Sequence, residues 1–336
     1  MIKSMATTEV LEDRKVRSAL TSALCEVCPV CIIGRGNYLL AAPDRFHLRN
    51  ETYQLVRCST CTGVWLESPP SFAEMGLHYT EDYHRAIMAA GEGDVHNRWQ
   101  YQQRVISRYK QGGAILDIGC SSGAFLSMMK APSWDLYGIE MEESTAERAR
   151  KTTGAKVFVG EATTAPFRAD SFDVITSFDL LEHVYSPRQF LGKVLEWLKP
   201  GGVFYAMMPN IDSWEARVFG THWYGLELPR HLFHFSPRSV RYLMEELGFE
   251  EVLIRTPRAS YAERSFGYLF SSLLQKYGFS ATPQAKPSPR TFLERLARKG
   301  MRVTILNPIA WIASLAGAGP SMEVAFRKPS ENHSTR

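Results

Sequence analysis

The sequence has no strong excess of charge of either sign. Its 39 Lys and Arg are nearly balanced by 35 Asp and Glu, which leaves a net charge of +4 over 336 residues. Proteins that bind nucleic acid usually gather many more basic residues on one face, so the composition favours no nucleic-acid partner. Hydrophobic residues make up 45% of the chain. This excludes a disordered or collagen-like protein. The length of 336 residues is typical of about two domains.

The first twenty residues also lack the continuous apolar run and the small-residue cleavage site of a secretory signal. We therefore expect a cytoplasmic protein. Disulfides persist mainly in oxidising compartments, so the six cysteines are expected to be reduced thiols or metal ligands.

Four of these cysteines form two C-x-x-C pairs, Cys28 with Cys31 and Cys58 with Cys61. Two such pairs supply the four thiolates of a closed, tetrahedral zinc site, so we predict a structural Zn²⁺ ion. Cys25 lies three residues before Cys28 and could serve as a ligand in its place, so the sequence does not decide which four cysteines bind the ion. Scattered buried thiols and a redox pair are the alternatives. The pairs precede the strand and helix pattern, which argues against a redox pair.

From Gly113 onward, short apolar strands alternate with amphipathic helices, which is typical of a mostly parallel sheet with helices on both faces. Ser186 and Ser236 each precede a proline and are expected to begin a helix; the segment KPGG, 199–202, is expected to end the first one. The strands are expected at AILDIG, WDLYGIE, AKVFVG, FDVITSF, VFYAMMP, FEEVLIR and MEVAFRK.

The segment DIGCSSG, from Asp117 to Gly123, lies between a predicted strand and a predicted helix, where open α/β sheets bind ligands. It lacks the G-x-G-x-x-G pattern that seats a pyrophosphate, and no G-K-[ST] phosphate loop occurs in the chain. Glu140 ends the next strand about twenty residues on, where a carboxylate accepts hydrogen bonds from both hydroxyls of a ribose. The pattern therefore predicts a ligand that carries a ribose without needing a phosphate cradle.

These segments resemble the class I S-adenosylmethionine-dependent methyltransferases. The resemblance runs from Ala114 to Pro209 through ILDIGCSSGAFL, YGIE, GEATTAPF, SFDVITSFDLLEHV and LKPGGVFYAMMPN. It implies a doubly wound, mostly parallel seven-stranded sheet whose last strand, MEVAFRK, is antiparallel and inserted near the edge. Ser121 departs from the family pattern, because many members carry a third glycine there.

The resemblance also implies that the chain binds S-adenosyl-L-methionine. The glycine loop would lie along the amino acid part of this cofactor, Glu140 on the ribose and Glu161 near the adenine amino group. The implied cofactor-binding residues are Asp117, Gly119, Cys120, Gly123, Glu140, Glu161 and Phe178.

Methyl transfer to a hydroxyl needs an aligned acceptor and a base that removes its proton. Glu182 and His183, in FDLLEHV, follow the fourth strand, whose end faces the methyl group in the resembled fold. Adjacent side chains diverge, so one of the two is expected to reach the acceptor; we favour His183, with an ordinary pKa of about 6.5. The alternative is that Glu182 complements the next helix and His183 is packed. By the resemblance, the absence of N-P-P-Y or D-P-P-Y argues against exocyclic amines of bases as acceptors.

The segment PNIDSWEARVFGTHWYGLELPRHLFHFSP, 209–237, is rich in Trp, Tyr, Phe, His and Arg. Aromatic faces with polar tips suit a sugar or a ring acceptor, and His231 is a second candidate base. If the chain is extended here, His231, Phe233 and Phe235 share one face. The alternative is aromatic packing that anchors a long loop. The H-x-x-H pair formed with His234 is a weak metal site, since we identify no carboxylate at helical spacing.

Before the last strand lies an insertion, 258–320. Its part 286–302 carries six basic residues against one acid, and an uncharged segment follows. This pattern predicts peripheral contact with an anionic membrane surface, the inner membrane face, through 286–320. A lid or a dimer surface over the acceptor pocket is the alternative. Asn307 and Pro308 argue against a spanning helix.

The cysteine module, the methyltransferase motifs and the stretch W-Y-G-L-x-L-P-R-H-x-x-H-F together resemble bacterial methyltransferases of surface-glycan and exopolysaccharide biosynthesis. This implies O-methylation of a saccharide or a lipid-linked saccharide. A quinone or phenol acceptor is an alternative, because LEHV also resembles the ubiquinone-pathway O-methyltransferases, which generally lack the cysteine module. An RNA methyltransferase that reads RNA through the zinc module is another, but four arginines between Cys25 and Pro70 are balanced by four acids. A non-catalytic zinc scaffold with a relict cofactor pocket is the last alternative.

The acceptor is thus expected to be a small molecule or a glycan. The expected organisation is an N-terminal tail at 1–24, a zinc-binding module at 25–70, a helical linker or cap at 71–112, a methyltransferase domain at 113–257 and 321–329, the helical insertion at 258–320 and a C-terminal tail at 330–336.

Overall fold

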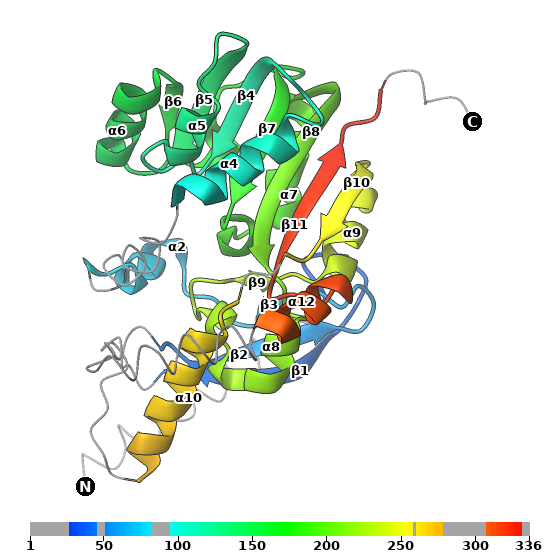
Figure 1. Cartoon of the computed structure of the whole chain (residues 1–336). Helices are drawn as coiled ribbons and strands as arrows, with labels where there is room; N and C mark the ends of the chain where they lie inside the picture. Colours follow the sequence, from blue (N-terminus) through cyan, green and yellow to red (C-terminus); the bar gives the residue numbers. More distant parts are fainter. Residues whose placement is uncertain are drawn as a thin grey trace, which may run out of the picture.

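The computed structural model describes residues 27–45, 51–81, 83, 95–257, 260–277 and 307–330. Its strands form two sheets, the larger of which lies above the smaller in Figure 1. The larger sheet is 7-stranded, in the order β10-β11-β8-β7-β4-β5-β6, and the smaller is 4-stranded, in the order β1-β2-β3-β9. The described ranges do not include Cys25 or the basic part of the insertion, 286–302, so the predictions made for them lie outside the described residues.

The larger sheet confirms the fold class expected from the sequence. β4, β5, β6, β7 and β8 run parallel to one another, whereas β11 is antiparallel to both β8 and β10. The last strand therefore lies between β8 and β10, as the resemblance implied. The strands are β1 (Gly36–Pro43), β2 (Thr52–Cys58), β3 (Val64–Leu66), β4 (Gly113–Ile118), β5 (Trp134–Glu140), β6 (Lys156–Val159), β7 (Phe172–Phe178), β8 (Leu198–Pro209), β9 (Phe233–His234), β10 (Glu250–Arg255) and β11 (Ser321–Arg327).

Helices and short 3-10 turns connect these strands. The α-helices are α2 (Phe72–Met75), α4 (Val95–Ile106), α5 (Ala124–Met128), α6 (Glu143–Thr153), α7 (Pro187–Trp197), α8 (Trp214–Phe219), α9 (Pro237–Glu246), α10 (Ala262–Lys276) and α12 (Asn307–Leu315). The 3-10 turns are η1 (Gly76–His78), η2 (Ala162–Thr164), η3 (Leu181–His183), η4 (Gly220–His222) and η5 (Tyr224–Leu226).

Both predicted helix starts are found, but one predicted end is wrong. Ser186 and Ser236 are the N-cap residues of α7 and α9, and only the Ser236 hydroxyl accepts a hydrogen bond from the helix, at Ser239 N. α7 ends at Trp197, and the KPGG segment belongs to β8. The reason is pairing with the last strand, because Gly201 N donates to the carbonyl of Lys328 and so joins the sheet.

The alternation of side chains along β4 builds a core on each face of the larger sheet. Leu116 and Ile118 belong to a cluster with Val194 of α7, whereas Ile115 belongs to a second cluster with Val105 of α4. α4 crosses the near face of the sheet in Figure 1. Each such side chain contributes about 1.5–3 kcal/mol when it is fully buried, so helices on both faces stabilise the sheet.

The smaller sheet contains a strand from a distant part of the chain. β9 pairs with β3 through Val64 opposite His234 and Trp65 opposite Phe233. The amide of Leu66 continues the ladder by donating to the Leu232 carbonyl over 2.9 Å. The loop after β8 is thereby held against the N-terminal module.

A buried ion pair joins the same two regions. Arg230 Nη2 lies 3.1 Å from Asp44 Oδ2, and neither side chain is exposed to solvent. Arg230 also donates from Nε to the His78 carbonyl, and its guanidinium lies 4.5 Å from the centroid of the Tyr83 ring. His78 Nδ1 in turn lies 3.0 Å from Asp44 Oδ2. A fully buried guanidinium is costly unless it is paired and hydrogen-bonded in this way.

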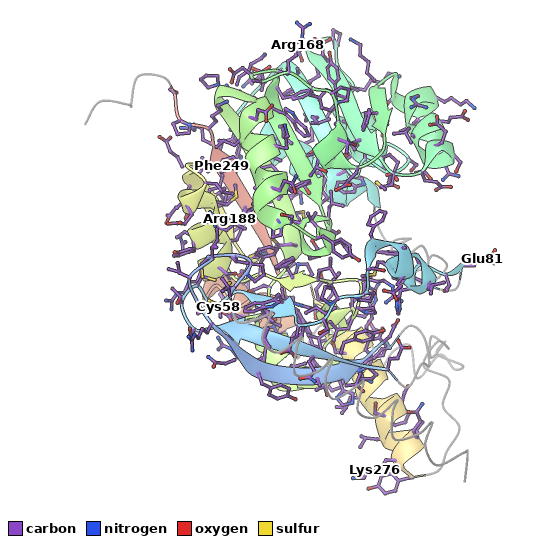
Figure 2. All side chains as sticks on the ribbon, turned by 180° about the vertical axis from the view of Figure 1, so that it is seen from behind. Cys58, Glu81, Arg168, Arg188, Phe249 and Lys276 are labelled. Atoms are coloured by element: carbon purple, nitrogen blue, oxygen red, sulfur yellow. The ribbon has the colours of Figure 1, made fainter. Side chains whose placement is uncertain are left out.

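Two further contacts, both less buried than the Arg230–Asp44 pair, also hold the N-terminal module against the larger domain. Arg57 of β2 forms an ion pair with Asp212, at 2.9 Å, in which both side chains are about a third exposed. Arg188 of α7 donates to the Val30 carbonyl over 2.6 Å. Figure 2 shows Arg188 on the larger domain above Cys58 of the module.

The described parts of the insertion carry exposed apolar side chains. On α12, Trp311, Ile312 and Leu315 are exposed, as are Phe270 and Leu273 on α10. Within the described ranges, no helix combines the length and the apolar content needed to cross a membrane. Peripheral membrane contact through 286–320 stays a prediction.

We expect Asp44→Asn to lower the free energy of unfolding by about 3–5 kcal/mol, because it leaves the buried Arg230 charge without its counter-ion. Urea denaturation followed by circular dichroism measures this loss. Asp212→Asn is the matched control, since it breaks an exposed pair between the same two regions and should cost less than about 1 kcal/mol. Equal losses of stability in both variants would contradict the conclusion that the buried Arg230–Asp44 pair stabilises the contact between the two regions more than the exposed pair does.

Candidate active site

The predicted cofactor loop lies at the carboxyl edge of the larger sheet. Asp117 is buried near the end of β4 and accepts a hydrogen bond of 2.7 Å from the Thr176 hydroxyl on the neighbouring strand β7. Burial raises the pKa of Asp117 to about 7, and the charge of Glu140 acts in the same direction. The position suits a carboxylate that gains a cationic partner when a ligand binds.

The loop itself needs left-handed backbone at three positions. Gly119, Ser121 and Gly123 have φ angles of 76°, 48° and 81°. A Cβ at Gly123 would lie 3.1 Å from the Cα of Ala149, so the helix packed beside the loop also requires glycine there. Ser121, the position that departs from the family pattern, takes the conformation that favours glycine.

Glu140 ties the loop to the end of β5. Its carboxylate accepts hydrogen bonds from the amides of Ser121 at 2.9 Å, Met141 at 2.8 Å and Glu142 at 3.1 Å. Gly119 and Ser121 are exposed at this edge, while Glu140 is half-buried. These groups fit a ligand that has both an ammonium group and ribose hydroxyls.

The other predicted cofactor residues surround this edge. Glu161 is exposed after β6 and accepts a hydrogen bond of 2.8 Å from the Thr163 hydroxyl. Phe178, at the end of β7, lies edge-on to Phe125 with ring centroids 4.8 Å apart. Cys120 is buried, and burial raises its pKa to about 12, so it is a neutral thiol. The cofactor roles of these residues stay predictions.

Next to the loop, the structure brings together the three predicted catalytic residues. A ligand atom from each of Glu182, His183 and His231 lies within 4.8 Å of the others. We expected Glu182 and His183 to diverge, but the tight 3-10 turn η3 allows both to approach His231. The Leu232 amide donates to the Glu182 carbonyl over 2.8 Å, which holds the two segments in place.

Burial changes the acid–base chemistry that was expected of this cluster. It lowers the pKa of His183 to about 4 and that of His231 to about 3. The expectation of an ordinary histidine pKa at His183 is therefore wrong, because its environment disfavours the charged imidazolium. Glu182 is buried too, and burial raises its pKa well above the ordinary value, with the charge of Asp179 adding to the effect.

Sequence reasoning missed two groups beside the cluster. Glu227 Oε2 lies 3.8 Å from His231 Nε2, and its other oxygen accepts a hydrogen bond of 2.6 Å from the Tyr83 hydroxyl. The Tyr79 hydroxyl lies 3.2 Å from His183 Nδ1. Glu227 precedes His231 by four residues, which is a helical spacing visible in the sequence. The expectation that no carboxylate stands at helical spacing from this histidine is therefore wrong. Nothing in the sequence near Tyr79 indicates its contact with His183.

Most aromatic side chains of the segment 209–237 are packed rather than presented to a ligand. Trp223, Phe233 and Phe235 are buried, and the rings of Phe233 and Phe235 stack with centroids 6.1 Å apart. These rings anchor the loop, which was the alternative expected from the sequence.

Two aromatic rings outside this segment, Phe72 and Tyr185, are exposed and lie edge-on with centroids 6.1 Å apart.

The four cysteines of the C-x-x-C pairs converge in the N-terminal module. One ligand atom from each lies within 4.8 Å of the others, and all four side chains are buried. The sulfurs of Cys28 and Cys61 are 3.6 Å apart, and those of Cys31 and Cys58 are 3.5 Å apart, so neither pair is a disulfide. This donor set suits a tetrahedral zinc ion.

Backbone amides surround these sulfurs in the manner that favours thiolates. Cys28 Sγ accepts from the amide of Val30 at 3.3 Å, and Cys31 Sγ accepts from Gly34 at 3.2 Å. Cys58 and Cys61 also accept backbone N–H bonds. The Cys28 thiol is the main cause of a lowered pKa at Cys61, about 5. A Cβ at Gly34 would lie 2.2 Å from Cys58 Sγ, so only glycine fits beside the cluster.

We expect the purified chain to carry zinc at the cysteine cluster and to lose that ion in Cys58→Ser. Metal that binds only the folded state stabilises it by about 4 kcal/mol when free zinc is about 1,000 times the Kd. Mass spectrometry of bound metal and thermal unfolding after chelation measure both effects. Cys120→Ser is the control, because this buried cysteine lies outside the cluster. Equal metal loss in both variants would contradict the assignment.

Comparison with known proteins gives the domain a family. Residues 95–254 match a family model described as a methyltransferase domain. The ubiquinone biosynthesis O-methyltransferase of Bordetella avium is 27% identical over 217 residues, which cover 62% of this chain and 71% of that protein. The protein of the same name from Aromatoleum aromaticum is 31% identical over 127 residues, which cover 35% and 54%. A SAM-dependent methyltransferase structure from Archaeoglobus fulgidus is 16% identical, covers 73% of this chain and 100% of that chain, and has a TM-score of 0.49.

The chain spans about half the length of several curated relatives that it matches, with values of 52%, 54% and 53%. The matched range contains the glycine loop, Glu140, Glu161 and the segment that carries Glu182 and His183. Residues 95–254 of this chain therefore form a class I S-adenosylmethionine-dependent methyltransferase domain.

Proposed function

We propose that this chain transfers a methyl group from S-adenosylmethionine to a hydroxyl of a saccharide or a lipid-linked saccharide. One observation carries the proposal: the carboxyl ends of β4, β5 and β7 bring a glycine loop, the Glu140 carboxylate and a histidine cluster to one edge. The loop and the cluster segment are adjacent, because a Cβ at Gly119 would lie 3.4 Å from the Leu180 side chain. Parallel sheets bind their ligands at this edge.

The chain's own residues divide the work between binding and proton removal. Asp117 and the exposed backbone of Gly119 would receive the amino acid part of the cofactor, and Glu140 would accept hydrogen bonds from its ribose. S-adenosylmethionine supplies an electrophilic methyl group. His183 and His231, both neutral at pH 7, would hold the acceptor hydroxyl and help to remove its proton as the oxygen forms its bond to the methyl carbon.

Two features support a saccharide acceptor. Phe72 and Tyr185 present exposed rings, and Tyr185 follows His183 by two residues. Aromatic faces next to polar groups suit the mixed apolar and hydroxylated surface of a sugar. The four-cysteine module, for which we propose a structural zinc ion, is the second feature, because it accompanies the resemblance to surface-glycan methyltransferases.

A quinone or phenol acceptor is the second candidate. The named relatives at 27% and 31% identity are ubiquinone biosynthesis O-methyltransferases, and this is the observation that favours it. The two candidates differ in the acceptor and share the same cofactor chemistry.

The experiment is transfer of labelled methyl from S-adenosylmethionine into a host extract separated into RNA, solvent-extractable lipid and water-soluble glycan. We expect label in glycan, or in lipid from which mild acid releases it into the water phase. Label that stays in the lipid after acid would favour a quinone instead. Label confined to RNA would overturn the proposal and assign recognition to the zinc module.

We expect Glu140→Ala to abolish this labelling and to weaken S-adenosylmethionine binding by roughly 10- to 100-fold, because charge-assisted hydrogen bonds are lost. Isothermal titration calorimetry measures the binding. Glu143→Ala is the control, because Glu143 lies three residues away on the exposed first turn of α6. Unchanged binding in Glu140→Ala would remove this residue from the cofactor site.

His183→Gln should slow methyl transfer by about 100-fold or more while the cofactor affinity stays at the wild-type value. The reason is that His183 belongs to the acceptor side of the site and Glu140 to the cofactor side. Single-turnover transfer and cofactor titration separate the two effects. Unchanged turnover would exclude His183 from the mechanism.

A further inference from the structure

Glu182, His183 and His231 meet with the geometry of a metal-binding site. They come from two segments, the turn η3 and the loop before β9, and one ligand atom from each lies within 4.8 Å of the others. The rings of His183 and His231 have centroids 4.6 Å apart at an interplanar angle of 77°. A near-perpendicular pair of imidazoles is able to direct one nitrogen each to a common point.

Hydrogen bonds fix which nitrogen of each histidine is available. His183 Nδ1 lies 3.0 Å from the Arg230 carbonyl, and His231 Nδ1 lies 2.9 Å from the Gly225 carbonyl. A carbonyl only accepts, so each Nδ1 carries the proton and each Nε2 keeps its lone pair. Metal-binding histidines are held in this way by a backbone or carboxylate acceptor. The Tyr79 hydroxyl, 3.2 Å from His183 Nδ1, leaves Nε2 unengaged as well.

Glu182 supplies an independent reason for a cation. Its side chain is buried, 2% exposed, and among the described residues neither of its carboxylate oxygens has a hydrogen-bond partner. A buried carboxylate without a partner is costly whether it is charged or neutral. A cation bound between Glu182 and the two Nε2 atoms removes this cost. Glu227, whose Oε2 lies 3.8 Å from His231 Nε2, places a second carboxyl group beside the same point.

We propose that Glu182, His183 and His231 bind a divalent transition-metal ion, of the class of Zn²⁺ or Fe²⁺, at the acceptor side of the methyltransferase site. Two imidazoles and one carboxylate are the ligand set of catalytic zinc sites and of non-haem ferrous sites, and both keep at least one position open. The cysteine cluster differs, since its four thiolates close the coordination sphere.

The open position gives the ion a role in methyl transfer, and this part rests on the proposed function. An acceptor hydroxyl bound to the cation loses its proton to solvent more easily, as water does when a bound zinc ion lowers its pKa to about 7. The resulting alkoxide oxygen forms the bond to the methyl carbon while the carbon–sulfur bond of the sulfonium breaks. The electron pair of that bond goes to sulfur, and S-adenosylhomocysteine leaves. The neutral histidines then act as ligands and need not accept the proton themselves.

The test counts metal in the full chain, so it needs neither cofactor nor acceptor. The protein is stripped with a chelator, dialysed against Zn²⁺ and then against buffer, and the bound zinc is measured by mass spectrometry. We expect two zinc ions in the wild type, one at each site, and one in Glu182→Gln. The zinc that remains at the cysteine cluster shows that this isosteric variant is folded.

His234→Gln is the matched control. His234 is buried with its ring centroid 5.9 Å from that of His231. Its Nε2–H donates a hydrogen bond to the Leu226 carbonyl over 2.9 Å, and it does not belong to the cluster. It should keep two zinc ions. One ion in the wild type, or two in Glu182→Gln, would overturn the proposal. A failure of the labelled-methyl experiment with two ions still bound would overturn only the proposed function.

Substitution with Co²⁺ gives a second readout at the same sites. Thiolate ligands produce an intense charge-transfer absorption, whereas nitrogen and oxygen ligands give only weak visible bands. In Glu182→Gln we expect the weak bands of cobalt bound by nitrogen and oxygen to disappear. The intense absorption of cobalt at the cysteine cluster should stay at the wild-type value. Equal loss of both signals would place the missing ion at the cysteines and overturn the proposal.

Discussion

The structure depends on the attachment of the loop after β8 to the N-terminal module. This loop supplies β9 to the module's sheet, and its Arg230 forms a fully buried ion pair with Asp44 on the segment after β1. The next residue, His231, belongs to the cluster with Glu182 and His183, and the Arg230 carbonyl accepts from His183 and so orients its ring. The contact that joins the two regions therefore also arranges the candidate site.

This arrangement also connects the cysteine cluster to the candidate site at the edge of the larger sheet. The cluster brings together the turns around Cys28 and Cys58. β1 follows the first turn, and the second turn connects β2 to β3. β3 is the strand on which β9 pairs. A zinc ion bound by the four cysteines would thus support the segment that carries His231. Four thiolate ligands would leave such an ion no open position and therefore no direct part in the chemistry.

Electrostatics divide the methyltransferase edge into two parts. On the cofactor side, carboxylates are met by donors: Glu140 accepts three amides and Asp117 accepts the Thr176 hydroxyl. On the acceptor side, Glu182 is buried without a described partner, beside histidines whose charged forms are disfavoured. The first part is ready for hydroxyl and ammonium groups. For the second we propose a cation, because its buried carboxylate has no hydrogen-bond partner among the described residues.

The sequence by itself determined what depends on short spacing. The C-x-x-C pairs, the order of strands and helices, the glycine loop and Glu140 follow from local patterns, and the sheet confirmed the fold that they predict. Only the tertiary structure decided what depends on distant pairs. Asp44 and Arg230 are 186 residues apart, and no local pattern encodes their contact. The lowered pKa of the half-buried His183 was equally hidden. A pKa is set by surroundings that packing creates and not by neighbours in the chain.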